Sequence, residues 1–220
     1  MLRSTMPGVK YVHPSKKRTM RFADLARWVP RIEGELRREY ALAARRDPPF
    51  RPWTGTLQEF ALRGGKRLRA LLVLAGYALA ARRAPAPALP AAAALEHFQS
   101  WMLIHDDVID HAEIRRGGPA VHRRLAAEHA AARWAGSSDE FGVGMGITLG
   151  DLEEPYTVEA LLAAKLPAER RLRAVAEYAS MTRDTAYGQL LDIRNGVRPV
   201  EAVREEDVLE VHRLKTSVYT

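Results

Sequence analysis

The sequence of 220 residues contains no cysteine, so a disulfide framework and thiolate chemistry are excluded. It also has no apolar run close to the roughly 20 residues that cross a bilayer. Its richest apolar stretch, residues 70–81, has the length of a buried helix. Strand-like runs of Val, Ile and Thr between turn residues are missing as well. We therefore expect a helical protein without a transmembrane segment, located in the cytoplasm.

Composition and charge indicate one globular domain with a basic leader. Hydrophobic residues make up 47% and charged residues 28% of the chain, and 220 residues suffice for one sizeable core. The net charge is +7, and residues 1–21 hold six Lys or Arg and no acid. Pro7 and Pro14 interrupt any amphipathic pattern there, so we expect residues 1–21 to be a disordered leader rather than a transit peptide. The folded domain is then expected over residues 22–220.

Helical periodicity dominates from Phe22 onward, which predicts an all-α fold. Pro and Gly clusters punctuate the periodic segments and mark short loops. The predicted helices span residues 30–44, 66–82, 91–111, 120–134, 139–149, 158–164, 168–194 and 205–220. Helices joined by such loops imply a bundled or orthogonal all-α domain. The last helix contains no stop signal, so we expect the sequence to be truncated at its C-terminus.

An acidic segment, Asp106-Asp107-Val108-Ile109-Asp110, carries the functional prediction. On a helix Asp106 and Asp110 lie one turn apart on the same face, where two unpaired carboxylates would repel each other. Magnesium relieves such repulsion and is held by one or two carboxylates together with substrate phosphates and water. Gln99 and Met102 lie on nearly the same stripe. The flanks are apolar almost all round, so the helix should be buried, and its carboxylates then need a metal or a basic partner.

Three separate basic groups could face these carboxylates. Arginine forks bind phosphate oxygens bidentately, and free N–H groups at a helix start favour anions. Two glycines precede the first group, whose cations would be unfavourable in a first helical turn without an anion. The groups are Lys66-Arg67-Leu68-Arg69, Arg115-Arg116 and Lys215-Thr216. One metal clamp with three basic groups predicts a site for two diphosphates.

These motifs, in their order, resemble the polyprenyl synthetase (trans-isoprenyl diphosphate synthase) family. The resemblance covers about residues 62–220. It rests on Gly64-Gly65-Lys66-Arg67-Leu68-Arg69, Leu103-Ile104-His105-Asp106-Asp107-Val108-Ile109-Asp110, Arg115-Arg116-Gly117 with Val121-His122, Gly188-Gln189-Leu190-Leu191-Asp192, and His212-Arg213-Leu214-Lys215-Thr216. It implies an isoprenoid synthase-like helical bundle, usually dimeric, that joins isopentenyl diphosphate to an allylic diphosphate with magnesium.

The resemblance also implies roles for individual residues. Asp106 and Asp110, supported by Asp107, would bind magnesium that bridges to the allylic diphosphate, which Arg115 and Lys215 would contact. Four residues would hold isopentenyl diphosphate: Lys66, Arg69, Gln99 and Arg116. Three more would lie near the reacting carbon and the developing cation: Gln189, Asp192 and Thr216.

Product length is expected to depend on the apolar stripe below the carboxylates. Met102 lies one turn before Asp106, and Trp101 is a bulky neighbour. In this family an aromatic residue five positions before the first Asp resembles the arrangement of short-chain synthases. We therefore expect a product of fifteen or twenty carbons, such as farnesyl or geranylgeranyl diphosphate.

Two departures from the family pattern stand out. Family members carry a second aspartate-rich motif several tens of residues after the Lys-Thr pair, whereas Asp106-Asp107 is the only Asp-Asp pair here. A longer natural protein cut at Thr220 is the expectation, and a catalytically incomplete homologue is the alternative. Pro155 also falls where the family pattern leads us to expect an uninterrupted helix.

Other functions explain less of the sequence. A metal phosphohydrolase using His105-Asp106 would need histidines on neighbouring helices, and a class I terpene cyclase would leave Lys66, Arg69 and Arg116 without a role. A nucleic-acid-binding module would give no role to buried carboxylates and would show basic residues interleaved with aromatic ones. A regulatory partner of a complete synthase is the non-enzymatic alternative.

Overall fold

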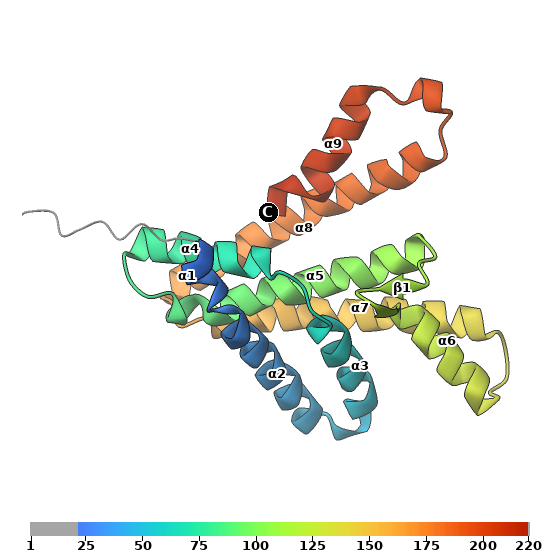
Figure 1. Cartoon of the computed structure of the whole chain (residues 1–220), viewed down its shortest axis with the longest axis horizontal. Coiled ribbons are helices and arrows are strands. Elements are labelled where there is room, and N and C mark those ends of the chain that lie inside the picture. Colours follow the sequence, from blue (N-terminus) through green and yellow to red (C-terminus); the bar gives the residue numbers. More distant parts are fainter. Residues whose placement is uncertain (1–21, 220) are drawn as a thin grey trace, which may run out of the picture.

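The computed structural model describes residues 22–219, and helices form nearly all of this part (Figure 1). The predicted all-α class is confirmed. The predicted leader, residues 1–21, lies outside the described residues, as does Thr220. The elements are α1 (Phe22–Ala26), α2 (Val29–Arg46), η1 (Pro48–Phe50), α3 (Arg51–Leu62), α4 (Leu68–Ala81), η2 (Ala86–Ala88), α5 (Leu89–Ile109), β1 (Ile114–Arg115), β2 (Gly118–Pro119), α6 (Val121–Ala132), α7 (Ser138–Ala163), α8 (Ala168–Gly196), η3 (Val200–Ala202), α9 (Glu205–Lys215) and η4 (Ser217–Tyr219).

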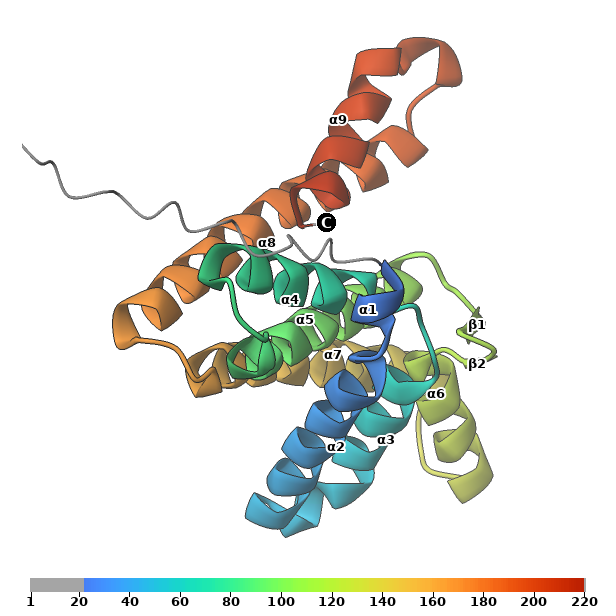
Figure 2. The same cartoon turned by 60° about the vertical axis from the view of Figure 1, so that its left-hand side comes forward.

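Helices α5 and α7 run side by side through the centre of the body (Figures 1 and 2). The pair α2 and α3 packs on one side of them, α6 packs on α7, and α4 lies on α5. One apolar cluster joins five of these helices, because each turns its buried stripe toward the same space. It includes Leu36 of α2, Phe60 of α3, Ile104 of α5, Leu125 of α6 and Leu149 of α7.

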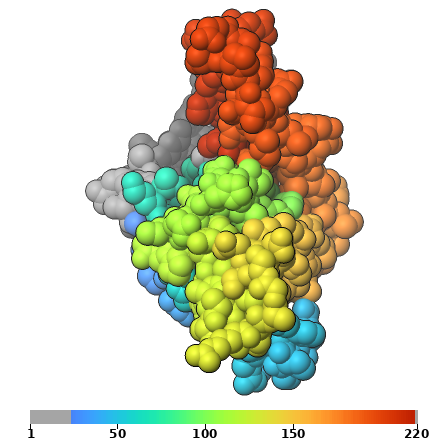
Figure 3. All heavy atoms as spheres, turned by 90° about the vertical axis from the view of Figure 1, so that its right-hand side faces the viewer, coloured from blue at the N-terminus to red at the C-terminus, as the bar shows by residue number. Residues whose placement is uncertain are grey.

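Helices α8 and α9 form a helical hairpin that projects from the body as an arm (Figures 1 and 3). The first part of α8 is anchored on α5, where the rings of Tyr178 and Phe98 meet edge to face with centroids 5.8 Å apart. Further along, apolar side chains of the arm face solvent, among them Leu190 at 63% and Val197 at 83% exposure. The arm returns at its end to the C-terminal end of α5, where Lys215 contacts Asp106.

Glycines let α7 approach its neighbours closely. Gly142, Gly146 and Gly150 recur every four residues and therefore share one face of the helix. A Cβ atom at Gly146 would lie 2.9 Å from the Cβ of His122, and one at Gly150 would overlap the imidazole ring of His105. The carboxylate-bearing helix thus lies directly against the backbone of α7.

A buried polar network ties α2, α5 and α7 together. His97 of α5 lies between two carboxylates, with Nδ1 2.6 Å from Glu153 of α7 and Nε2 2.9 Å from Glu39 of α2. The hydroxyl of Tyr40 donates to the other oxygen of Glu153 at 2.6 Å. Burial disfavours the charged imidazole, but the two carboxylates outweigh this effect and raise the pKa of His97 to about 9. The network therefore includes an imidazolium at neutral pH.

Several predicted helix boundaries were wrong. Helix α3 was not predicted: α2 ends at Arg46 before Pro48 and Pro49, but Pro52 in the first turn of α3 then opens a further helix. The helix predicted from Lys66 begins at Leu68, so Lys66 lies in the preceding loop. The short β1–β2 hairpin was not predicted either; it pairs Arg115 with Gly118.

Pro155 lies inside one continuous helix. The segments predicted separately over 139–149 and 158–164 are both parts of α7, which runs from Ser138 to Ala163. A proline within a helix removes one hydrogen bond and costs about 3 kcal/mol. Packing of α7 along the whole of α5 outweighs this cost, so the uninterrupted helix expected from the family pattern is present.

Candidate active site

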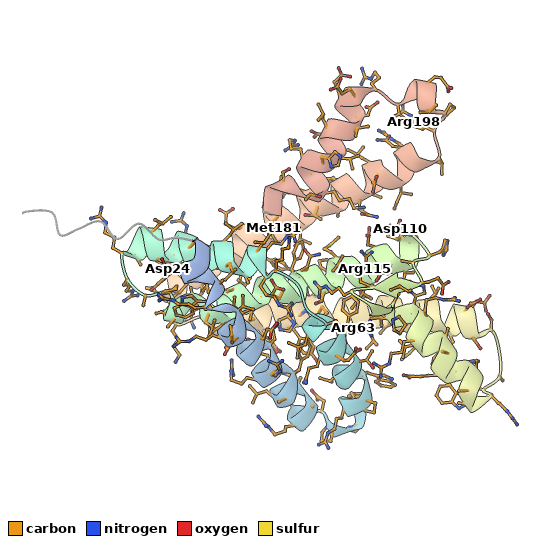
Figure 4. All side chains as sticks on the ribbon, viewed as in Figure 1. Asp24, Arg63, Asp110, Arg115, Met181 and Arg198 are labelled. Atoms are coloured by element: carbon orange, nitrogen blue, oxygen red, sulfur yellow. The ribbon has the colours of Figure 1, made fainter. Side chains whose placement is uncertain are left out.

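The predicted carboxylates lie at the C-terminal end of α5, on the side of the body that faces the arm (Figure 4). The backbone N–H of Asp110 donates to the carbonyl of Asp106 at 2.8 Å, so the two residues remain one helical turn apart. The carboxylate of Asp106 is partly accessible, and that of Asp110 is exposed. Both side chains can therefore meet a ligand arriving from solvent.

Asp107 differs from its two neighbours because it is fully buried. Its Oδ1 accepts a hydrogen bond of 2.6 Å from Nε of Arg115, which lies in the hairpin after α5. Burial raises the pKa of Asp107, while Arg115 acts in the opposite direction. The same guanidinium lies 3.6 Å from Asp106. Asp107 thus holds Arg115 beside the accessible carboxylate, which is a supporting position.

Lys215 brings two further parts of the chain together. Its ammonium nitrogen lies 3.1 Å from Asp106 of α5 and 2.6 Å from Asp192 of α8. Burial opposes the charge, but the hydrogen bonds to these carboxylates outweigh it and raise the pKa of Lys215. Gly188 sets this position, since a Cβ atom there would come within 2.7 Å of the Lys215 Cα. A cation therefore already lies where carboxylates of two helices converge.

The residues present fit a magnesium ion held jointly with a substrate. Within residues 22–219 no group of three His, Asp or Glu side chains could hold a metal unaided. Magnesium in phosphate-transferring sites is usually bound by one or two carboxylates, with phosphate oxygens and water completing the shell. Asp106 and Asp110 could supply such a partial shell, and Arg115 and Lys215 are cations beside Asp106 that phosphates could meet.

The second group of predicted residues surrounds the loop between α3 and α4. Gly64 and Gly65 adopt positive φ values of 91° and 122°, conformations that glycine permits, and Lys66 is exposed after them. Arg69 lies in the first turn of α4. Arg116 reaches this region from the hairpin, and its Nη1 lies 3.5 Å from the carbonyl of Ala61.

Gln99 has a buried side-chain oxygen without a hydrogen-bond partner within residues 22–219. Buried polar atoms are normally satisfied, so this orphan indicates a missing partner. Burial, followed by repulsion from Arg67, lowers the pKa of Arg116. The amide oxygen of Gln99 can only accept a hydrogen bond, so its missing partner must be a donor, whereas an anion bound beside Arg116 would offset the repulsion from Arg67.

The remaining predicted residues line α5 and the arm. Gln189 is 9% exposed and lies three residues before Asp192 on α8; its Oε1 has no hydrogen-bond partner in the part of the chain that the structure describes. Thr216 is exposed and caps α9. Trp101 and Met102 are half-buried and pack against the cluster around Tyr178 of α8. Both therefore belong to the apolar cluster in which α5, α7 and the first part of α8 meet.

The sequence pattern of the polyprenyl synthetase family matches residues 52–220. The chain belongs to the polyprenyl synthetase family. It is 35% identical over 170 residues to the geranylfarnesyl diphosphate synthase of Natronomonas pharaonis, and the match covers 70% of this chain and 45% of that protein. It is 34% identical over 156 residues to the geranylgeranyl diphosphate synthase of Methanosarcina mazei, covering 70% and 42% respectively.

Solved polyprenyl synthetase structures share the fold. The geranylgeranyl pyrophosphate synthase of Corynebacterium glutamicum, complexed with isoprenyl diphosphate and magnesium, superposes with a TM-score of 0.80 at 33% identity. That match covers 90% of this chain and 57% of the other. The chain thus spans less than half the length of these two curated relatives and somewhat more than half of this solved structure.

The sequence did not predict the direction in which the Arg67 side chain points. Arg67 lies within the predicted diphosphate loop but points into the protein, where its guanidinium is buried against Glu96 and Glu33. The sequence did offer one signal: Glu96 is an acid within an apolar helical stretch, ten positions before Asp106, and Glu is seldom fully buried without a partner.

None of the helices in the described part has the length and apolar content that a membrane crossing requires.

Proposed function

We propose that the protein joins isopentenyl diphosphate to an allylic diphosphate to form a short-chain isoprenyl diphosphate. One observation carries the proposal: Lys215 bridges Asp106 and Asp192, so that residues far apart in sequence form a single charged site. The loop that carries Lys66 forms a second cationic region together with Arg116, whose guanidinium reaches the carbonyl of Ala61 shortly before that loop. Two such regions suit two diphosphates and favour condensation over the cyclisation of one diphosphate.

The proposed reaction begins with the allylic substrate. Arg115 and Lys215 bind its diphosphate and stabilise the charge that grows as the allylic C–O bond breaks, with both electrons leaving on the oxygen. Asp106 and Asp110 would hold magnesium, which would supply additional neutralisation of the leaving group. Asp107 keeps Arg115 in place throughout.

Carbon–carbon bond formation follows. The π electrons of isopentenyl diphosphate, held by Lys66, Arg69, Gln99 and Arg116, form the new bond to the allylic carbon. A proton is then lost from the adjacent carbon, and the released diphosphate accepts it. Gln189 and Thr216 border the developing cation, and the apolar walls around Trp101 exclude water that would quench it.

The proposal extends to assembly and location. An apolar groove of about 380 Å³ lies between α3 and α7, with Phe50, Trp53 and Leu152 exposed along it. This groove supports the homodimer that the family resemblance implies. The cytoplasmic location stays a prediction from the sequence.

The test is a condensation assay of the full-length protein with radiolabelled isopentenyl diphosphate, magnesium and allylic primers of five to twenty carbons. We expect incorporation that chelation of magnesium abolishes, and a product of fifteen or twenty carbons. Absence of condensation with every primer contradicts the proposal. Binding of isopentenyl diphosphate without turnover would instead support the non-catalytic regulatory partner.

A further inference from the structure

Arg67 lies in the loop before α4, but its side chain does not face the same way as that of Lys66. Lys66 is exposed, whereas the Arg67 side chain is 1% exposed. The backbone of Arg67 is left-handed, with φ of 51°, a conformation that disfavours side chains larger than glycine. Its carbonyl accepts the N–H of Leu71 at 2.9 Å and so begins α4. Arg67 therefore marks the point where the loop is fixed to the body.

Two carboxylates hold the guanidinium. Nη1 lies 2.8 Å from Glu96 of α5, and Nη2 lies 3.3 Å from Glu33 of α2. The Glu96 side chain is 6% exposed, so this pair is almost completely removed from water. A buried pair of this kind adds little net stability compared with apolar residues of the same size, but a planar fork fixes orientation. The contact thus suits positioning better than stabilisation.

The pair also lies next to the residues proposed to bind isopentenyl diphosphate. Glu96 is three positions before Gln99 and so shares its face of α5. A Cβ atom at Gly65 would lie 3.8 Å from Nη1 of Arg67, so the glycine loop folds directly over the guanidinium. Arg67 and Glu96 are also both close enough to Arg116 to shift the pKa of its guanidinium: Arg67 lowers it and Glu96 raises it. The pair therefore contacts the loop and neighbours the hairpin arginine.

We propose that Arg67 and Glu96 are positioning residues for isopentenyl diphosphate, which set the place of the Gly64–Lys66 loop and of Arg116 without touching the substrate. This inference rests on the proposed function. Glu33 completes the grip on the guanidinium from α2. The alternative is an ion pair that only stabilises the fold.

The test uses the double variant Arg67→Met/Glu96→Gln, which removes both charges together. Arg67→Met alone leaves the buried Glu96 carboxylate unpaired and is expected to destabilise the protein strongly, and Glu96→Gln alone leaves the buried guanidinium with only the more exposed Glu33, whereas the double variant should unfold near the wild-type temperature. Arg67→Lys keeps the positive charge but loses the planar guanidinium that contacts two carboxylates at once. This variant replaces the double variant in the test if the double variant does not fold. Arg38→Met/Glu35→Gln removes an exposed pair of the same charges from α2 and is the matched control.

Isothermal titration with isopentenyl diphosphate decides between the two roles. We expect the folded double variant to bind about tenfold or more weakly, with Arg67→Lys intermediate and the control unchanged. In assays the KM for isopentenyl diphosphate should rise by a similar factor while kcat and the KM for the allylic substrate stay close to wild type. Folded variants that bind within twofold of wild type overturn the positioning role alone. Wild-type protein that binds no isopentenyl diphosphate overturns the proposed function, and this inference with it.

Discussion

The ammonium group of Lys215 lies 3.1 Å from a carboxylate oxygen of Asp106, although 109 positions separate the two residues. The contact joins the end of the arm to the end of α5, and Asp192 holds the same ammonium from α8. In this arrangement a side-chain cation lies within reach of the carboxylate expected to bind metal. A metal–diphosphate pair must therefore share Asp106 with Lys215 or draw the ammonium toward the phosphates.

This relationship predicts opposite effects of Lys215→Gln on metal binding and on turnover. Removing the ammonium should tighten manganese binding to the substrate-free protein several-fold, because one competing cation is lost. The rate of condensation should fall by roughly 10²-fold, since one donor to the leaving group is lost. Electron paramagnetic resonance of bound manganese measures the first effect. Arg213→Gln, which removes an exposed α9 cation paired with Glu210, is the control; weaker manganese binding by Lys215→Gln would argue against competition.

Asp106 and Lys66 should affect different kinetic constants. Asp106→Ala removes a metal ligand that matters most as the leaving group gains charge, so kcat should fall by about 10²-fold or more. Lys66→Ala removes an exposed cation near the second diphosphate and should raise the KM for isopentenyl diphosphate by about tenfold. Steady-state assays with each substrate varied in turn separate the two. Equal effects of both changes on both substrates would contradict the assignment.

Trp101 and Met102 should limit the length of the product. Both belong to the apolar cluster that includes Phe98 and Tyr178 and begins within about one turn of Asp106 on α5. Trp101→Ala/Met102→Ala removes much of the apolar barrier, here called the floor, that would stop the growing product chain. The product should therefore be longer by at least one five-carbon unit. Chromatography of the hydrolysed products provides the measurement. Leu103→Ala, which packs on a different cluster, should leave the length unchanged; an unaltered product from the double variant would exclude these residues as the floor.

His97 should make stability fall at alkaline pH. Its pKa of about 9 lies above the usual 6.5, so its contribution is present in full below about pH 6.5 and is lost as pH rises through 9. The shift corresponds to a few kcal/mol, on the order of 3. Tyr40 does not titrate first, because burial and then Glu153 raise its pKa well above the usual value. Glu39, Glu153 and the ring of Tyr156, 5.7 Å away, complete the surroundings.

Urea unfolding of wild type and His97→Gln between pH 6 and 10 tests this expectation. The variant should be less stable at pH 6 and should lose less stability as pH rises. Titrating groups away from this network act alike in both proteins, so the difference between the two curves reports His97 together with its partners Glu39 and Glu153. Parallel curves would show that the imidazole is neutral in the folded protein.

The sequence was sufficient for the helical class and for the pairing of charged groups, because both depend on spacing along one chain. The four-residue step from Asp106 to Asp110 survives in the structure, and the Lys215 motif does meet the aspartates. Spacing could not show whether an individual side chain points to solvent or into the protein. Asp107 and Arg67 each lie next to a predicted ligand in sequence, but their side chains point into the protein. There Asp107 pairs with Arg115, and Arg67 pairs with Glu96. Helix α3 was missed because the proline-rich stretch after α2 favours a loop by its local signals, whereas Pro52 lies in the first turn of another helix.

Pro155 is a local helix-breaking signal that does not break the helix in the folded protein. Taken alone, proline predicts a break, but α7 packs along α5 for most of its length and remains helical. Local propensity is thus outweighed by tertiary packing, which a single sequence does not display.

The glycine face of α7 has a consequence for mutational tolerance. Gly150 lies against the imidazole of His105, next to Asp106 in sequence, and Gly142 and Gly146 lie against His122. A methyl group at Gly150 would have to push α7 away from the acidic end of α5, and one at Gly142 or Gly146 would have to push α7 away from α6. In a saturation mutagenesis screen these three positions, which contribute no chemical group, should therefore tolerate fewer substitutions than exposed Asp110.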